Sequence, residues 1–146
     1  MAVKLNTQQL ISKTFASVPE TVEHVETITD NISRKMKFSE QDRDSIAIAI
    51  TEAVNNAIYH GNKLSARKKI HFAIFSKGDT LQFVVRDEGS GFKPDDVPDP
   101  LEPDNLLKEN GRGIFILKSL MDEVYYDTSE NGTTLTLIKT KKEESE

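Results

Sequence analysis

Two short turn signals constrain the fold of this chain more than any other feature. Lys77-Gly78-Asp79 and Asn131-Gly132 each lie between two stretches in which apolar and polar residues alternate, as they do in β-strands. These stretches are residues 69–76 and 80–87 around the first turn, and residues 124–128 and 133–139 around the second. Turns of this kind join neighbouring antiparallel strands. The chain is therefore predicted to contain two hairpins within a mainly antiparallel sheet.

Apolar residues at steps of three and four predict the helices. Such residues run from Val18 to Met36 and predict a helix over 18–37, with Ser17 and Glu20 at the spacing of a capping box. A second helix is expected from about 40 to 60 and a third after Gly113, while residues 10–15 fit an edge strand. This order of elements predicts an α+β fold, a two-layer sandwich with three main helices on one face of a mainly antiparallel mixed sheet.

Composition excludes several classes of function. The length of 146 residues suits one domain, expected over residues 1–140, with a charged tail over 141–146. A net charge of −5 gives no general footprint for a nucleic-acid backbone, and the lack of Cys excludes disulfides and thiolate chemistry. No apolar signal region opens the sequence, and the apolar run 46–50 is far shorter than the roughly 20 residues that a membrane span needs. We therefore expect a cytoplasmic protein that contacts neither nucleic acid nor membrane.

Two pairs of glycines mark places where the backbone can approach a ligand. Gly89 and Gly91 follow a predicted strand, and Gly111 and Gly113 open a predicted helix. Without a β-carbon the backbone can lie against a bound molecule, and the free N–H groups of a helix start suit phosphate. Either pair alone is equally typical of a plain turn.

The second predicted helix presents polar side chains along one side. Glu52, Asn56 and His60 are four residues apart, so they lie on successive turns of one face. Asn offers a hard oxygen ligand that suits Mg²⁺, and Glu can accept a proton from a nucleophile. The alternative is a solvated helix face, with His60 as a packing or capping residue before Gly61.

Taken together, four motifs resemble the ATP-binding domain of the GHKL superfamily, which has the Bergerat fold. They are Glu52-Ala-Val-Asn55-Asn56-Ala-Ile-Tyr-His60-Gly61, then Asp87-Glu-Gly89-Ser-Gly91-Phe92, then Gly111-Arg112-Gly113, and finally Gly132-Thr133-Thr134. The motifs occur in the superfamily's order, and the resemblance covers about residues 10–140. Any one of them is weak evidence, whereas four in order are specific.

The resemblance implies a role for each matching residue. It implies that Asn56 coordinates Mg²⁺ at the phosphates of ATP, and that Glu52 is the base that polarises the acceptor hydroxyl. It implies that Asp87 hydrogen-bonds the adenine amino group with help from Thr133. The remaining cofactor-binding residues are glycines at the base, sugar and phosphates, with an arginine as a possible partner of the γ-phosphate: Gly89, Gly91, Gly111, Gly113 and Arg112. Asp87 could instead cap a turn, and Arg112 could be a surface residue.

Within the superfamily, the chain's size is similar to that of the bacterial anti-sigma factor serine/threonine kinases of the RsbW and SpoIIAB type. That likeness implies phosphorylation of a Ser on an anti-anti-sigma protein, alternative binding of a sigma factor, and possible homodimers. Two other functions stay open: a nucleotide-gated binding module without kinase activity, and a histidine-kinase-type domain acting on a separate phosphotransfer protein. Four of the five prolines lie within 94–103 among acidic residues. We therefore expect residues 93–110 to form a lid that nucleotide orders.

Overall fold

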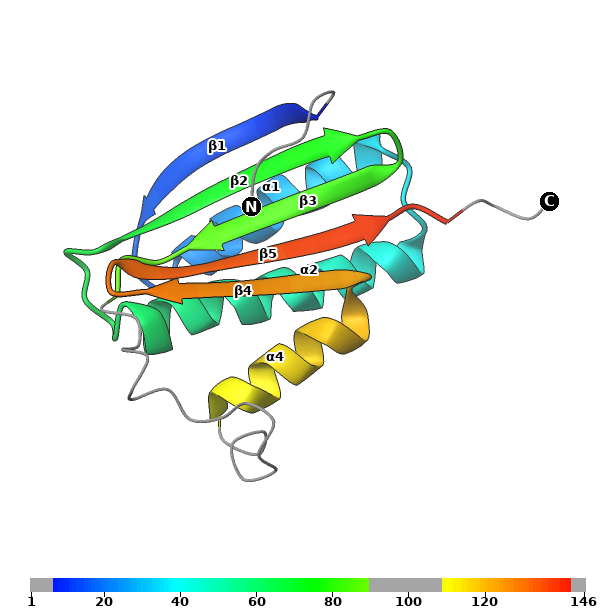
Figure 1. Ribbon diagram of the computed structural model, residues 1–146. Helices are drawn as coiled ribbons and strands as arrows, with labels where there is room; N and C mark the ends of the chain where they lie inside the picture. Colours follow the sequence, from blue (N-terminus) through cyan, green and yellow to red (C-terminus); the bar gives the residue numbers. More distant parts are fainter. Residues whose placement is uncertain (1–6, 90–108, 143–146) are drawn as a thin grey trace.

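The computed structural model describes residues 7–89 and 109–142, which form a five-stranded sheet and the helices that pack on it (Figure 1). The strands are β1 (Gln8–Ala16), β2 (Lys69–Lys77), β3 (Thr80–Arg86), β4 (Glu123–Ser129) and β5 (Gly132–Thr140). Their order across the sheet is β1-β2-β3-β5-β4, and all four pairings are antiparallel. The predicted fold class is confirmed, with an antiparallel rather than a mixed sheet.

Both predicted hairpins are present. Lys77 pairs with Thr80 across the first turn, and Ser129 pairs with Gly132 across the second. Gly78 has a φ of 58°, a left-handed conformation that a side chain would strain. Residues 10–15 lie in β1 at one edge of the sheet, as predicted.

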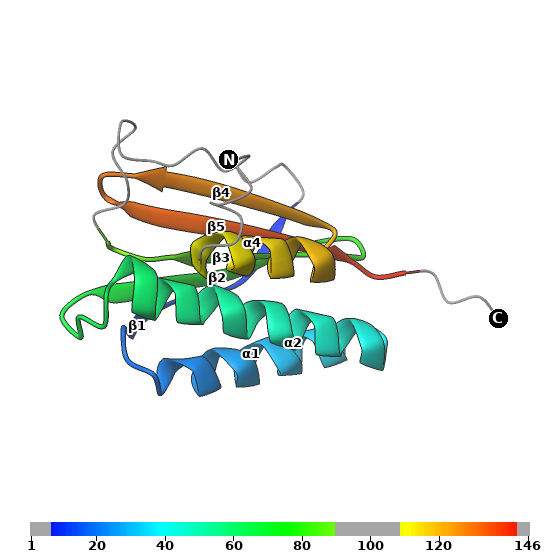
Figure 2. The ribbon, with the colours of Figure 1, turned by 90° about the horizontal axis from the view of Figure 1, so that it is seen from below.

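The helices α1 (Thr21–Lys35), α2 (Glu40–Asn55) and α4 (Glu109–Leu120) lie on one side of the sheet (Figure 2). A short π-helix, η1 (Asn56–Gly61), continues α2. Alternate residues of the central strands are buried beneath the helices because a strand points successive side chains to opposite faces. The predicted core positions of the second helix are all buried: Ile46, Ile50, Ala53, Ala57 and Ile58. None of the described helices is both long and apolar enough to cross a membrane.

The prediction for the ends of the first helix is partly wrong. The helix begins at Thr21 rather than at residue 18, and it ends at Lys35 rather than at residue 37. Its N-cap, Glu20, makes no side-chain capping bond. The Ser17 hydroxyl accepts a hydrogen bond from Asn62 instead of capping the helix. The segment before the helix is therefore tied to a distant residue through Ser17, while the Thr21 hydroxyl closes the helix start locally on the Ala16 carbonyl.

The second predicted helix reaches its expected end near residue 60, but its last six residues are a π-helix. It widens at Asn56 into η1, where the Asn62 N–H donates to the carbonyl of Ala57, five residues back, at 2.7 Å. Positive φ angles occur at Lys63 and Leu64 rather than at Gly61. Gly61 is therefore the last residue of η1 and is not in the left-handed conformation.

Candidate functional site

Asp87 directly follows β3 and is held in place by two strands. Only 5% of the residue is exposed. Its Oδ1 accepts hydrogen bonds from the N–H of Gly89 at 2.9 Å and from the N–H of Thr133 at 3.1 Å. The Asp87 N–H in turn donates to the Thr133 carbonyl at 3.0 Å. The predicted adenine-side residues Asp87, Gly89 and Thr133 therefore form one hydrogen-bonded group.

Three glycines surround this aspartate at distances that leave no room for a side chain. A β-carbon on Gly61 would lie 2.0 Å from Asp87 Oδ2, and one on Gly132 would lie 2.2 Å from the Asp87 carbonyl oxygen. A β-carbon on Gly89 would lie 2.1 Å from the Gly61 carbonyl oxygen. The end of η1 and the turn after β3 are therefore packed backbone against backbone around Asp87.

The other predicted residues meet where α2 contacts α4. Glu52 and Asn56 are half-buried. A β-carbon on Gly113 would lie 2.7 Å from Glu52 Oε2 and 2.9 Å from Asn56 Nδ2. The candidate base and the candidate metal ligand on α2 and η1 thus lie close to Gly113 of α4.

One helical segment joins the two clusters. Asn56 is the first residue of η1 and faces Gly113, while Gly61 is the last and faces Asp87. His60 is half-buried on the same segment. Gly111 and Arg112 lie by their backbone in the first turn of α4, and the role expected for Arg112 stays a prediction. Gly91 and residues 93–108 of the expected lid lie outside the described residues.

Burial dominates the electrostatics of the Asp87 carboxyl. It raises the pKa of Asp87 above its ordinary value, although the amides of Gly89 and Thr133 and the charges of Lys68 and Arg86 act in the opposite direction. The pKa of Tyr126 is raised as well, first by burial and also by the negative charge of Asp87, while a hydrogen bond with Thr133 lowers it. This β4 phenol therefore lies beside the same group. The sequence motifs do not include Tyr126, which is 44% exposed on β4.

The raised pKa of Asp87 predicts a specific dependence of stability on pH. The folded protein holds this proton more tightly than the unfolded chain does, so its contribution is favourable below the ordinary pKa of 3.8 and is lost as pH rises through the folded pKa. An asparagine introduced at this position would avoid the loss and still offer an oxygen to both amides. Urea unfolding is expected to show the stability of Asp87→Asn rising relative to the parent between about pH 4 and pH 7. If the stability of Asp87→Asn and that of the parent changed in parallel with pH, the raised pKa of Asp87 would be contradicted.

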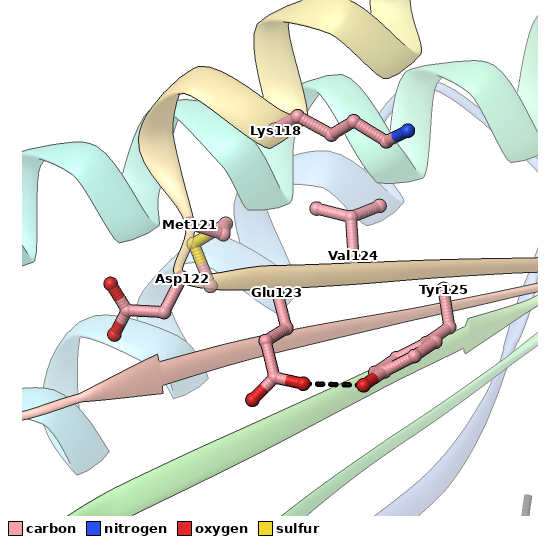
Figure 3. A pocket seen from close by; sticks show the side chains of 6 residues that line it. All are labelled: Lys118, Met121, Asp122, Glu123, Val124 and Tyr125. Atoms are coloured by element: carbon pink, nitrogen blue, oxygen red, sulfur yellow. Dashed lines mark hydrogen bonds between the residues drawn. The ribbon is translucent and has the colours of Figure 1, made fainter.

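The arrangement suits a nucleotide with a metal ion. The glycines let the backbone pack closely against Asp87, Glu52 and Asn56, and Asn56 with Glu52 supplies oxygen atoms of the kind that Mg²⁺ prefers. A separate cavity of about 380 Å³ lies between the end of α4 and β4 (Figure 3). It is lined by Lys118, Met121, Asp122, Glu123, Val124 and Tyr125, and thus by none of the predicted site residues.

Comparison with known proteins identifies a family of ATPase domains, which agrees with a nucleotide site. The histidine kinase-like ATPase domain family matches residues 15–139. The serine-protein kinase RsbW of Bacillus licheniformis is 31% identical over 130 residues, which cover 83% of this chain and 79% of that protein. RsbW of Staphylococcus epidermidis is 30% identical over 95% of this chain and 91% of its own length.

Solved structures show the same fold. The structure of the RsbU and RsbW domains of a Mycobacterium tuberculosis protein superposes with a TM-score of 0.67 at 20% identity, over 90% of this chain and 32% of that one. The catalytic domain of the histidine kinase ThkA superposes with a TM-score of 0.57 at 18% identity, over 90% of this chain and 97% of that one. An ATPase domain of this kind implies ATP binding. Because the family match spans most of the sequence, this chain belongs to the histidine kinase-like ATPase domain family of the GHKL superfamily, with RsbW serine-protein kinases as relatives.

Proposed function

We propose that this protein is an anti-sigma factor kinase, which uses ATP and Mg²⁺ to phosphorylate a Ser on an anti-anti-sigma protein and otherwise binds a sigma factor. The observation that carries the kinase part is the contact of Gly113 with both Glu52 and Asn56. It supports a role for Glu52 as proton acceptor and for Asn56 as oxygen ligand near the start of α4, where unpaired backbone N–H groups favour phosphate. The partner proteins are proposed from the RsbW relatives.

On the base side, Asp87 would accept a hydrogen bond from the adenine amino group. Its two amide donors already fix Oδ1, and Oδ2 lies against Gly61 in a position set by backbone. Thr133 would assist from β5, and Gly89 and Gly91 would let the chain pass the base and sugar. A carboxylate accepts hydrogen bonds but does not donate them, so the site favours adenine, which offers an amino group, over guanine, which offers a carbonyl there.

On the phosphate side, Asn56 would hold Mg²⁺, which when bound neutralises charge on the transferred group. Gly111, Arg112 and Gly113 would lie at the phosphates, where the unpaired backbone N–H groups of the first turn of α4 would donate to them, and the Arg112 guanidinium would add a positive charge. Glu52 would take the proton of the acceptor Ser hydroxyl as that oxygen bonds the γ-phosphorus and ADP leaves. A binding module that never transfers phosphate has no need for this carboxylate.

Transfer to candidate acceptors tests the proposal. The protein is incubated with γ-labelled ATP and small anti-anti-sigma-like proteins encoded near its gene, and labelled acceptors are then treated with acid. We expect label that survives acid, because phosphoserine is acid-stable and phosphohistidine is not. Acid-labile label would point to a histidine-kinase-type domain. ATP binding without transfer to any acceptor would favour the nucleotide-gated binding module.

A further inference from the structure

Asn62 is a buried side chain at the junction of four segments. It is 1% exposed, and its Nδ2 donates to Ser17 Oγ at 3.0 Å and to the Lys69 carbonyl at 3.0 Å. Its Oδ1 accepts from the Glu88 N–H at 2.8 Å. The amide side chain therefore ties the end of η1 to the β1–α1 connection, to the start of β2 and to the turn after β3. A buried polar group with this many partners holds their positions closely.

Two of the four segments that Asn62 joins lie next to the candidate nucleotide site. It directly follows Gly61, which packs on the Asp87 carboxylate, and its partner Glu88 directly follows Asp87. The backbones of these two segments touch, since a β-carbon on Gly89 would lie 2.1 Å from the Gly61 carbonyl oxygen. A shift of the Glu88 amide would therefore move Asp87 relative to Gly61.

The same residue closes the π-turn. In an α-helix, residues five apart lie about 140° apart around the axis, so Asn56 and Gly61 would face different directions. The hydrogen bond from the Asn62 N–H to the Ala57 carbonyl spans five residues and is of the π type, which brings residues five apart closer to one side. This turn lets one segment contact Gly113 at its start and Asp87 at its end.

The far side of Glu88 is held as well. Its Oε1 accepts from the Lys69 N–H at 3.0 Å, and its Oε2 lies 2.7 Å from His71 Nε2. These contacts anchor the Glu88 side chain on β2, while Asn62 anchors its backbone. The turn that carries Asp87 is therefore fixed from two directions.

We propose that Asn62 is a positioning residue of the nucleotide site, which acts through Glu88 and Gly61 to hold the Asp87 carboxylate in register with Asn56. The inference rests on the proposed ATP site. It predicts that loss of the Asn62 side chain weakens recognition of the base beyond what a loss of stability explains.

Three variants separate positioning from stability. Asn62→Ala removes all three side-chain bonds, whereas Asn62→Asp keeps an acceptor for the Glu88 amide and loses both donated bonds. Lys139→Met is the matched control: Lys139 is 6% exposed, donates to the Leu120 carbonyl at 2.7 Å and lies 3.9 Å from Asp42 Oδ1, far along β5 from Thr133. Calorimetry measures ATP and GTP binding below the unfolding midpoint of every variant, and amide exchange is followed without nucleotide.

Asn62→Ala is expected to weaken ATP binding about 10-fold and GTP binding less, so that selectivity for adenine narrows. Asn62→Asp is expected to weaken ATP binding as well, because it cannot donate to Ser17 or to the Lys69 carbonyl, and each variant carries the test if the other does not fold. Lys139→Met is expected to lower the unfolding midpoint and leave selectivity unchanged. Unchanged ATP affinity and selectivity in both Asn62 variants would overturn the proposal.

Amide exchange distinguishes failure of this inference from failure of the proposed function. Absence of ATP binding by the parent would contradict the proposed function. In ligand-free Asn62 variants, we expect the amides of Glu88, Gly89 and Thr133 to exchange faster relative to the amides of central β2 than they do in the parent. Equal relative protection at these three amides would overturn the positioning role, whatever the parent binds.

Discussion

Replacing Glu52 by glutamine is expected to lower phosphoryl transfer to the acceptor serine about 10²–10⁴-fold while ATP affinity stays within a few-fold of the parent value. Glutamine has nearly the size of glutamate and keeps an oxygen, so the contact with Gly113 is preserved. It cannot accept the proton of the attacking hydroxyl. Loss of a negative charge near the phosphates would even favour slightly tighter ATP binding. Single-turnover transfer and ATP titration on the same preparations measure the two effects separately.

Asn56→Ala is the comparison that separates loss of the metal ligand from loss of the base. If Asn56 holds the metal, its loss is expected to weaken both ATP binding and transfer, whereas Glu52→Gln is expected to affect transfer alone. The two side chains lie one helical turn apart and both contact the position of Gly113, so they sample the same surroundings. Equal transfer rates for Glu52→Gln and the parent would remove Glu52 from the mechanism.

The fold could be predicted largely because its signals are local. The hairpin turns at Gly78 and Gly132 and the apolar periodicity of α1 and α2 each depend on neighbouring residues. The capping box failed because Ser17 is bound by Asn62, 45 residues away, which no local pattern reveals. The π-turn could not be predicted for a different reason, because α-helical spacing and the first residues of a π-turn have the same apolar pattern.

The candidate site was predictable only as far as residue types carry chemistry. Asp87, Gly89 and Thr133 come together as the motif order indicated, and so do Glu52, Asn56 and Gly113. The sequence placed Gly61 only at the end of a helix, and it did not indicate that the lack of a side chain there makes room for Asp87. Asn62 gave no signal, because an asparagine after a helix is typical of an ordinary turn and its partners lie in three other segments.

Asp87→Asn is expected to weaken ATP binding by about 1.5–3 kcal/mol, or roughly 10- to 150-fold, because a charged hydrogen bond to the adenine amino group is lost. The oxygen of the introduced asparagine can still accept from Gly89 and Thr133, which forces its amino group to the Oδ2 position facing Gly61 and the base. A donor would then meet a donor. Since burial of the carboxylate disfavours its charge, the same variant is expected to be no less stable than the parent at neutral pH. Calorimetric titration with ATP and urea unfolding on one preparation would show affinity falling without loss of stability, which separates a residue kept for the ligand from one kept for the fold. Unchanged ATP affinity would remove Asp87 from adenine recognition.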